Sequence, residues 1–190
     1  MNTAAQKVEE VISLKVTLRG IRPPIWRRLE LPRRMSLNQL HDAIQAAMGW
    51  YGGHLYVFDV AGRSYGDPAM VDHVADDTRL TIGGVMKSGV RRFTYTYDFG
   101  DNWEHEIVIE GKRAAMAGRR YPACIAGRRN CPPEDCGGVW GYREFLAALA
   151  DPSSAQADQW SEWMEGDFDP EKFSVELVDA RIGTRLKSPA

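Results

Sequence analysis

The amino-acid sequence predicts an α+β fold, in which a single domain contains a mixed, mostly antiparallel sheet backed by helices. Several separate segments alternate apolar and polar residues with a period of two, which is the pattern of half-buried strands. One segment instead spaces its apolar residues by three and four behind a helix-capping sequence. The chain has 190 residues, of which 44% are hydrophobic and 26% are charged. This size and composition are typical of one globular domain with its own core.

The first predicted feature is a strand hairpin. Residues 12–20 and 25–31 both alternate apolar and polar side chains, as half-buried strands do. Pro23 and Pro24 interrupt the alternation between them, at a place where no ladder donor is needed. We therefore expect the two segments to pair as neighbouring strands.

A helix is predicted directly after the hairpin. Ser36 and Gln39 have the spacing of a capping box, in which each side chain bonds to the backbone of the other residue. Gly49 follows the last apolar residue of the pattern and is expected to end the helix. The apolar stripe of this helix consists of Leu37, Leu40, Ile44, Ala47 and Met48.

More strand patterns follow this helix. Residues 54–60 form a strand candidate, Tyr65 belongs to a short return strand, and residues 66–78 have the composition of a polar loop. Residues 91–99 and 103–110 give the clearest alternation in the chain. We expect these two segments to form an antiparallel hairpin.

The loop length sets the predicted register of this second hairpin. A three-residue turn at 100–102, with Asn102 in the left-handed conformation, aligns the two apolar rows. Asp98 then lies opposite Glu104, and such a pair requires a cation or a basic side chain beside it. Arg92 meets Glu110 on the same face. The expected partners on the apolar face are Phe99 with Trp103, Tyr97 with His105, Tyr95 with Ile107, and Phe93 with Ile109.

The remaining third of the chain is less regular. Residues 111–140 are predicted to form a thirty-residue loop, which is long for an idle connection. A helix follows at 142–149 and stops before Pro152, and a second helix carries Ala157, Trp160 and Met164. A last short strand is expected at Phe173, Val175 and Leu177.

Composition bounds the organisation and location of the chain. We expect one domain at 11–180 between a flexible N-terminus at 1–10 and a flexible C-terminus at 181–190. The first ten residues lack the apolar segment of a signal peptide, which predicts a cytoplasmic protein. The longest wholly apolar run, 145–150, has six residues, far short of the roughly 20 that span a bilayer. The net charge of −2 excludes a uniformly basic, histone-like binder.

The three cysteines are a candidate metal site. Cys124, Cys131 and Cys136 lie within thirteen residues of the long loop, and their odd number makes a poor disulfide framework. Thiolates are zinc ligands, so these residues predict a zinc site, with zinc as a possible cofactor. The alternative is that they are small buried residues or form a facultative disulfide. The candidates for a fourth ligand are His54, His105 and Asp135.

Carboxylates and an imidazole gather around the turn of the second hairpin. Asp98, Asp101, Glu104 and His105 supply the ligand types of a Mg²⁺ or Mn²⁺ site, as a metal-dependent nuclease or hydrolase would need. Glu134 and Asp135 are further candidates for such a site. The alternative is a hairpin whose aromatic row fills the core, with His105 hydrogen-bonded inside.

Two basic segments raise the alternative of nucleic-acid binding. Arginines are dense in the first hairpin and again in the long loop, and Trp26 and Trp50 are aromatic side chains on which a base can stack. The isoelectric point of the whole chain is 6.1, below that of a basic nucleic-acid-binding domain. The alternative without a binding function is that the two basic segments are solvent-exposed strand faces whose arginines pair with acidic residues. The arginines and lysine are Arg19, Arg22, Arg27, Arg28, Arg33, Arg34, Lys112, Arg113, Arg119, Arg120, Arg128 and Arg129.

Seven separated motifs, in order, resemble the plasmid pRiA-type ORF-three-like family. They cover Pro24–Arg28, Leu40–Gln45, Met48–Trp50, His54–Phe58, Tyr97–His105, Cys131–Gly138 and Gly141–Tyr142. The resemblance implies a compact α+β domain of bacterial plasmids, mobile elements and chromosomes, without an established activity. The order of hairpin, helix and strand is also similar to the start of a β-grasp fold.

Some members of that family are labelled insertion-element passenger TnpR-like proteins, which suggests a serine recombinase. Such an enzyme needs a nucleophilic serine near its N-terminus beside an arginine cluster, and then a helix-turn-helix tail. Ser13 lies within a predicted strand, and the C-terminal part of this chain is acidic. We interpret the label as a reflection of genetic neighbourhood.

We therefore expect a non-enzymatic binding or accessory module whose partner is a nucleic acid or another protein, with no membrane involved. The alternatives are a nucleic-acid-binding accessory protein of a transposable element and the metal-dependent nuclease or hydrolase described above. Binding groups concentrate at turns and strand ends, and the charged and aromatic residues there define the expected recognition surface. Its predicted residues are Trp26, Arg27, Arg28, Trp50, His54, Tyr97, Asp98, Asp101, Trp103 and His105.

Overall fold

A computed structural model of the chain describes residues 9–155, 157–163 and 167–186. Its strands are β1 (Glu10–Leu18), β2 (Ile25–Pro32), β3 (Tyr56–Val60), β4 (Arg63–Gly66), β5 (Ala75–Asp76), β6 (Arg92–Tyr97), β7 (Trp103–Ala114) and β8 (Ala123–Arg128). Its helices are α1 (Leu37–Met48), the 3₁₀ turn η1 (Asp77–Arg79), α2 (Ile82–Lys87), α3 (Gly138–Ala150), α4 (Ala157–Trp163) and α5 (Val175–Arg185). Within the described ranges, no helix is both long and apolar enough to cross a membrane.

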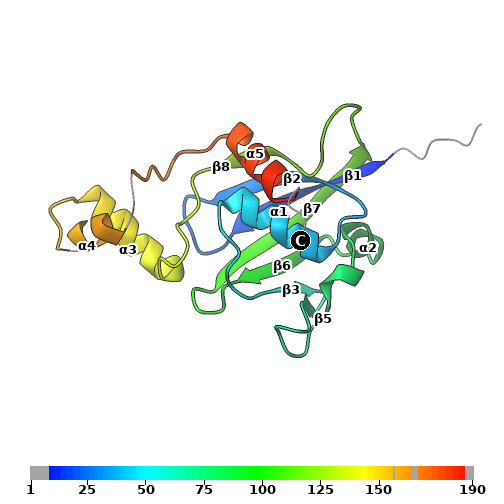
Figure 1. Ribbon diagram of the computed structural model, residues 1–190, viewed down its shortest axis with the longest axis horizontal. Helices are drawn as coiled ribbons and strands as arrows, with labels where there is room; N and C mark the ends of the chain where they lie inside the picture. Colours follow the sequence, from blue (N-terminus) through cyan, green and yellow to red (C-terminus); the bar gives the residue numbers. More distant parts are fainter. Residues whose placement is uncertain (1–8, 156, 164–166, 187–190) are drawn as a thin grey trace, which may run out of the picture.

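The strands form one eight-stranded sheet in the order β5-β4-β3-β6-β7-β1-β2-β8. The short β4–β5 contact is parallel, and the other pairs are antiparallel. Helices α1 and α5 lie across one face of this sheet, while α3 and α4 extend beyond one end of it (Figure 1). The predicted α+β fold, with a mostly antiparallel sheet backed by helices, is confirmed.

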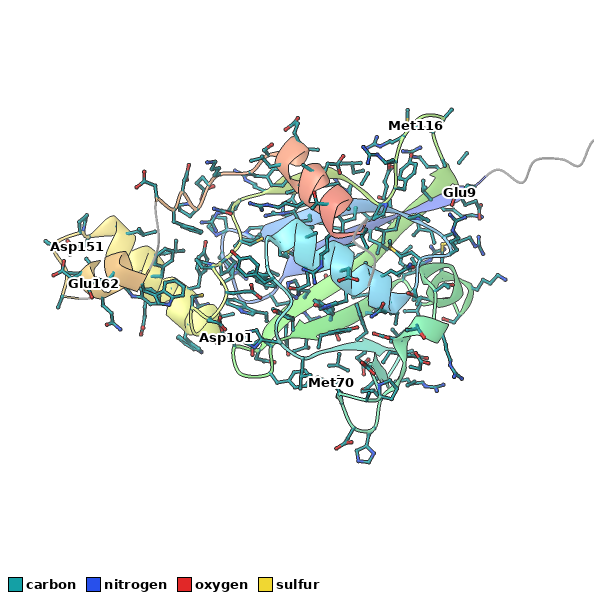
Figure 2. All side chains as sticks on the ribbon, viewed as in Figure 1. Glu9, Met70, Asp101, Met116, Asp151 and Glu162 are labelled. Atoms are coloured by element: carbon teal, nitrogen blue, oxygen red, sulfur yellow. The ribbon has the colours of Figure 1, made fainter. Side chains whose placement is uncertain are left out.

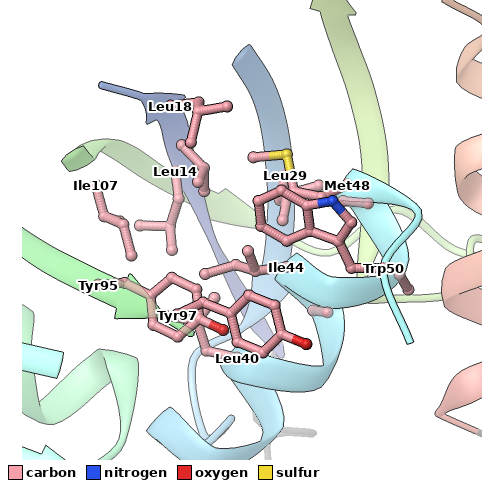
Figure 3. Packing of buried hydrophobic residues seen from close by; sticks show 14 of the residues in the cluster. Leu14, Leu18, Leu29, Leu40, Ile44, Met48, Trp50, Tyr95, Tyr97 and Ile107 are labelled. Atoms are coloured by element: carbon pink, nitrogen blue, oxygen red, sulfur yellow. The ribbon is translucent and has the colours of Figure 1, made fainter. Parts of the chain in front are cut away.

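The core lies between the sheet and α1. Alternate residues of β1, β2, β6 and β7 point toward the helix, and each contributes a buried apolar or aromatic side chain. Figure 3 shows how Leu40, Ile44 and Met48 of α1 face this row, with Tyr95 and Tyr97 packed beside them. The predicted helical stripe is therefore the buried stripe.

Helix α1 has the predicted ends. The Ser36 side chain accepts a hydrogen bond from Gln39 N, and the Gln39 side chain accepts one from Ser36 N, so the capping box is complete. Gly49 has a φ of 89°, the left-handed conformation that a residue with a Cβ rarely adopts. The helix consequently stops at Met48, and the chain turns toward His54.

The hairpin of β6 and β7 has the predicted faces but a different register. Tyr97 pairs with Trp103 and Tyr95 with His105, two residues away from the expected partners. The connecting loop therefore spans five residues, 98–102, and the prediction of a three-residue loop was wrong. A shift of two preserves the alternation, because the side-chain period of a strand is two. The aromatic row still faces the core.

Asp98 explains this shift. Its backbone N–H donates to Leu55 O at 2.8 Å, and its φ of 56° takes the chain out of the ladder one residue after Tyr97. Phe99 is therefore exposed instead of facing Trp103. Asn102 has the predicted left-handed conformation, with a φ of 53°.

The register also changes the predicted partners of the charged residues. Glu104 lies opposite Thr96 rather than Asp98, and Arg92 lies opposite Val108 rather than Glu110. The Glu104 carboxylate lies 3.6 Å from the Arg19 guanidinium. Glu104 and Asp98 therefore do not form the predicted like-charge pair.

The predicted thirty-residue loop contains more structure than expected. Strand β7 continues to Ala114, β8 pairs with β2 over Ala123–Arg128, and α3 begins at Gly138. The sequence of β8 lacks a clear apolar–polar alternation, because its register with β2 shifts between Arg28 and Leu29 and so breaks the period of two. Residues 123–128 therefore form a strand because they pair with β2, and not because their own sequence alternates.

The predicted strand at Phe173–Leu177 was wrong, because the chain forms helix α5 there. Ser174 caps this helix by accepting a hydrogen bond from Leu177 N. Its buried residues are Val178 and Ile182, one helical turn apart, whereas Leu177 is exposed. The same helix includes residues 181–185, which we expected in a flexible tail. Helix α4 carries Ala157 and Trp160 as predicted, and Met164 lies outside the described residues.

The first turn of α3 has no room for a side chain at Gly141. Adding one methyl group there should therefore have a large effect on stability. A Cβ on Gly141 would overlap the backbone carbonyl of Cys136, which cannot rotate away. We expect Gly141→Ala to lower the free energy of unfolding by about 1–3 kcal/mol, the cost of overpacking. Gly183 of α5 has open space around its Cα. Gly183→Ala should therefore stabilise the protein slightly, and urea unfolding of both variants compares the two helical glycines.

Candidate functional site

Three loops meet at one end of the β6–β7 hairpin. They are residues 49–55 after α1, the turn itself at 98–102, and residues 129–137 before α3. One residue from each loop brings a metal-binding side chain to the same place, namely His54, Asp98 and Asp135. We call these three residues, with their hydrogen-bonded neighbours Tyr97 and Glu134, the three-loop site.

The ligand atoms of the three residues converge. His54 Nε2 lies 2.9 Å from Asp135 Oδ1 and 3.8 Å from Asp98 Oδ2. One ligand atom from each residue lies within 4.8 Å of the other two. Across the part of the chain that the structure describes, no other three His, Cys, Asp or Glu side chains come together in this way. Asp98 is buried, His54 is half-buried and Asp135 is exposed, so the cluster opens to solvent on one side.

Asp98 is fixed so that one carboxylate oxygen faces His54. Its Oδ1 accepts a hydrogen bond from Gly100 N at 2.9 Å and a longer one from Asp101 N at 3.4 Å. Its backbone N–H is bonded to Leu55 O, on the residue after His54. The loop that carries His54 and the turn that carries Asp98 are therefore tied to each other, and Oδ2 remains available.

Glu134 orients the other two loops. Its Oε1 accepts a hydrogen bond from the Tyr97 hydroxyl at 2.5 Å, and its Oε2 accepts one from Tyr51 N at 2.6 Å. The Tyr97 hydroxyl accepts in turn from His54 N at 3.4 Å. Burial, and the bond to the Glu134 carboxylate, raise the pKa of Tyr97, so its hydroxyl remains a donor. Glu134 thus links the segment of Asp135 to the segment of His54.

Trp50 forms the base under this arrangement. Its ring stacks on Tyr97 with centroids 5.4 Å apart, and Figure 3 labels both residues. The Trp50 Nε1 donates to Pro132 O at 2.8 Å. Trp50 and Tyr97 are both buried. They were predicted to lie on the recognition surface, and the structure instead places them in the core directly beneath it.

Asp101 joins the turn to α3 rather than to the cluster. Its Oδ2 accepts a hydrogen bond from Gly137 N at 3.2 Å, and a Cβ on Gly138 would overlap Asp101 O. Figure 2 shows Asp101 at the turn, beside the beginning of α3. The two glycines therefore allow the close approach that brings Asp135 to the turn.

The predicted nuclease set does not assemble as one site. Glu104 and His105 are successive residues of β7, so their side chains project to opposite faces of the sheet. His105 is completely buried, and its Nδ1 lies 3.4 Å from Tyr95 O. Burial lowers its pKa to about 4, so it is a neutral core residue at pH 7. Trp103 is buried on the same face, and the prediction that these two residues belong to the recognition surface was wrong.

Arg27 is a further correction, because its guanidinium is buried. Only 3% of this residue is exposed. Its Nε donates to Ala47 O at the end of α1, and its Nη1 donates to the carbonyl oxygens of Trp26 and Arg128. Its Nη2 donates to Cys131 Sγ at 3.0 Å. The side chain of Arg27 cannot contact a partner.

The neighbours of Arg27 along β2 lie on the opposite face of the sheet. Arg28 donates twice to the Glu110 carboxylate, at 2.6 and 2.8 Å. The charged groups of Lys15 and Arg28 lie 4.9 and 5.2 Å from the ring centre of Trp26. Trp26 and Arg28 therefore belong to a charge-balanced sheet face, apart from the three-loop site.

Carboxylates engage many of the other basic side chains. Arg33 and Lys112 both contact Glu10, and Arg113 contacts the buried Glu30. Arg129 is buried and contacts Glu171. The two basic segments of the sequence are thus largely interlaced with acidic residues rather than aligned as a phosphate track.

The three cysteines do not come together as the predicted zinc site. All three are buried free thiols. Cys131 lies between Arg27 and Met48, whereas Cys124 Sγ contacts Ala126 O. Burial raises the pKa of Cys124 to about 11 and raises that of Cys131 as well, which keeps these thiols protonated. Their role is in packing.

Sequence reasoning named all three ligand residues but did not bring them together as one set. Asp98 and Asp135 were both candidates for the nuclease metal site, whereas His54 was named for the recognition surface and, with Asp135, as a possible fourth ligand of the cysteine site. Tyr51, whose backbone holds Glu134, was not named at all. The signal that was present is a pair of glycines, Gly52 and Gly53, immediately before His54, which leaves the backbone free to turn.

Comparisons with known proteins place this chain in a family. A family model described as plasmid pRiA4b ORF-3-like protein matches residues 10–177. The uncharacterized protein y4hQ of Sinorhizobium fredii (strain NBRC 101917 / NGR234) is 42% identical over 159 residues, which cover 82% of this chain and 81% of that protein. The crystal structure of MM3350 from Methanosarcina mazei Go1, described as a protein of unknown function, superposes with a TM-score of 0.83 at 36% identity. That match covers 89% of this chain and 97% of MM3350. The chain belongs to the family of plasmid pRiA4b ORF-3-like proteins.

Proposed function

We propose that this protein is a binding module that holds a divalent metal ion, with zinc as the best-matched ion, in the three-loop site. The observation that carries the proposal is the convergence of His54, Asp98 and Asp135 from three separate loops. One imidazole nitrogen and two carboxylate oxygens are ligands that Zn²⁺ accepts. A site with three protein ligands leaves a fourth position for an exchangeable group.

The distances suit a small tetrahedral ion. Zinc bonds of about 2.0–2.2 Å place tetrahedral ligand atoms about 3.3–3.5 Å apart. The two separations from His54 Nε2, 2.9 and 3.8 Å, lie on either side of this value. The ligand atoms of Asp98 and Asp135 lie within 4.8 Å of each other, and movement of these two side chains toward the ion completes the geometry. The ion takes the place of the proton that otherwise links His54 to Asp135.

The hydrogen bonds around the cluster support the same proposal. Metal ligands are commonly oriented by a second layer of hydrogen bonds, which reduces the cost of arranging them. Asp98 has this support from Gly100 N, and the backbone of His54 has it from Tyr97. Glu134 positions the residue before Asp135 in the same way.

Zinc stoichiometry tests this proposal. We expect the purified protein, after incubation with Zn²⁺ and gel filtration, to retain one zinc ion per chain by elemental analysis. His54→Asn should reduce retained zinc at least tenfold, because an amide replaces the nitrogen ligand. The matched control is His73→Asn: His73 is exposed on another loop, with a φ of 60° that asparagine accepts.

The control also defines the result that contradicts the proposal. Equal zinc retention by His54→Asn and His73→Asn would show that the ion binds elsewhere. No retained zinc in the unmodified protein would remove the site. Circular dichroism spectra of the two variants should match that of the unmodified protein, since His54 and His73 both lie outside the core.

A further inference from the structure

Two of the three ligand segments, 49–55 and 98–102, carry exposed apolar side chains. Leu55 follows His54 and is 36% exposed, and Phe99 follows Asp98 and is 47% exposed. Tyr51, whose backbone N–H holds Glu134, is 88% exposed. Large exposed apolar side chains that border a functional site are typical of interaction surfaces. We call Tyr51, Leu55 and Phe99 the apolar rim.

The apolar rim is too open for a small molecule to be enclosed. Small-molecule sites are concave and cover most of the ligand surface. A tyrosine that is 88% exposed forms no such wall. Aromatic side chains with this exposure instead suit a protein partner, which brings enough surface of its own to cover them.

Charge selects the kind of donor that completes the metal site. The carboxylates of Asp98 and Asp135 neutralise a divalent ion, and those of Asp101 and Glu134 lie in the same two loops. The nearby Arg185 guanidinium is already bonded to Asp42 and to the Tyr51 carbonyl. An anionic fourth ligand would therefore add negative charge to a site without excess positive charge, whereas a neutral donor would not.

From these observations we infer that the metal-loaded site binds a protein partner through a histidine side chain that has a large apolar neighbour. The neutral imidazole takes the fourth metal position, and the apolar neighbour packs on the rim. Imidazole is a standard ligand of zinc and of the ions that substitute for it. This inference rests on the proposed function, because the histidine binds only when the metal is present.

Cobalt substitution tests the inference with a spectroscopic readout. The full chain is loaded with Co²⁺, whose visible absorption bands report on its ligands, and is titrated with capped peptides. We expect acetyl-Gly-His-Phe-amide to bind about tenfold more tightly than acetyl-Gly-His-Gly-amide, because the phenyl ring covers part of the rim. Acetyl-Gly-Asp-Phe-amide, which brings a carboxylate instead, should bind more weakly than either histidine peptide.

Variants of the rim separate the apolar contact from the metal. Tyr51→Ser and Phe99→Ser keep the backbone groups, so Co²⁺ uptake should not change, while affinity for the His-Phe peptide should fall severalfold. Met70→Ser is the matched control, since Met70 is 63% exposed on a different loop. That control should bind the peptide as the unmodified protein does.

The outcomes distinguish the two proposals. Absence of Co²⁺ absorption bands would overturn the metal site, and this inference with it. Bound Co²⁺ with equal affinity for the His-Phe and His-Gly peptides would overturn the role of the apolar rim alone. Bound Co²⁺ with tighter binding of the aspartate peptide would overturn the choice of a neutral donor.

Discussion

Replacing Arg27 by alanine is expected to lower the free energy of unfolding by about 3–5 kcal/mol, the largest loss we predict for a single charged residue. The guanidinium bonds to three backbone carbonyls, on α1, β2 and β8, and to one thiol in the segment after β8. Alanine removes all of these bonds, and the Ala47 carbonyl and the Cys131 thiol then lose a donor in a buried place. Each unsatisfied buried acceptor costs about 1–3 kcal/mol.

The position of Arg27 explains how a buried charge is tolerated without a carboxylate. The Ala47 carbonyl lies in the last turn of α1, where the helix dipole presents partial negative charge. Phe173 adds its ring face at 4.7 Å from the guanidinium carbon. The side chain therefore holds the end of α1, the segment from which the loop of His54 departs, against the sheet.

Arg28 is the matched control for this prediction. It is the next residue of β2, but its partially exposed guanidinium pairs with Glu110 on the solvent side of the sheet. Arg28→Ala should cost at most about 1 kcal/mol, as exposed ion pairs do. Urea unfolding of both variants measures the difference. Equal losses for Arg27→Ala and Arg28→Ala would contradict the structural role of Arg27.

The second large prediction is a loss of stability as the pH falls from 6.5 toward 5. His41 and His105 are buried, and burial lowers their pKa values to about 3 and about 4, from 6.5 in the unfolded chain. Between these values the unfolded chain binds two more protons than the folded protein. Stability is therefore complete above pH 6.5 and decreases on acidification, with a slope that approaches about 1.4 kcal/mol per pH unit for each histidine.

The contacts of His41 show why it stays neutral. Its ring stacks on Tyr56, with centroids 3.7 Å apart, and its Nδ1 lies 2.7 Å from the Tyr95 hydroxyl. The Arg185 charge adds to the effect of burial in lowering its pKa. A protonated His41 would place a second positive charge in this aromatic layer.

Unfolding free energies at pH 7.0, 6.0 and 5.0 measure the effect. Carboxylates with lowered pKa values, such as Glu10 and Glu110, contribute little to the slope in this range, because they lose their contribution only at lower pH. Burial raises the pKa of Asp77, so this residue acts in the opposite direction to the histidines. His41→Gln should reduce the slope by about half, although it lowers the overall stability. A stability that is flat from pH 7 to 5 would contradict neutral burial of both histidines.

Local patterns predicted most of the elements of this fold, because burial on one face leaves a periodic trace in the sequence. The capping box at Ser36 and the aromatic alternation of β6 are examples. The register of β6 with β7 was missed because it depends on a bond from Asp98 to Leu55, about forty residues earlier in the chain. Helix α5 was misread because Val175 and Leu177 alternate over too few residues to distinguish a strand from a helix.

The candidate site could be predicted in part, because Asp98 and Asp135 were assigned to one metal site but His54 was not placed with them. His54, Asp98 and Asp135 lie roughly forty residues apart in sequence, and no local spacing states that their loops meet. Their grouping depends on Glu134, which links the 129–137 loop to Tyr51 and Tyr97. Three further statements stay predictions: the cytoplasmic location, the domain limits of residues 11 and 180, and binding of nucleic acid.

The central claim is that His54, Asp98 and Asp135 hold a metal ion, and anomalous X-ray diffraction at the zinc edge tests it most directly. Crystals grown with Zn²⁺ should show one strong anomalous peak about 2 Å from His54 Nε2 and from one carboxylate oxygen of each aspartate. The same experiment on His54→Asn should show no peak there. A strong peak at the cysteines, or none at the three-loop site with zinc present, would contradict the account.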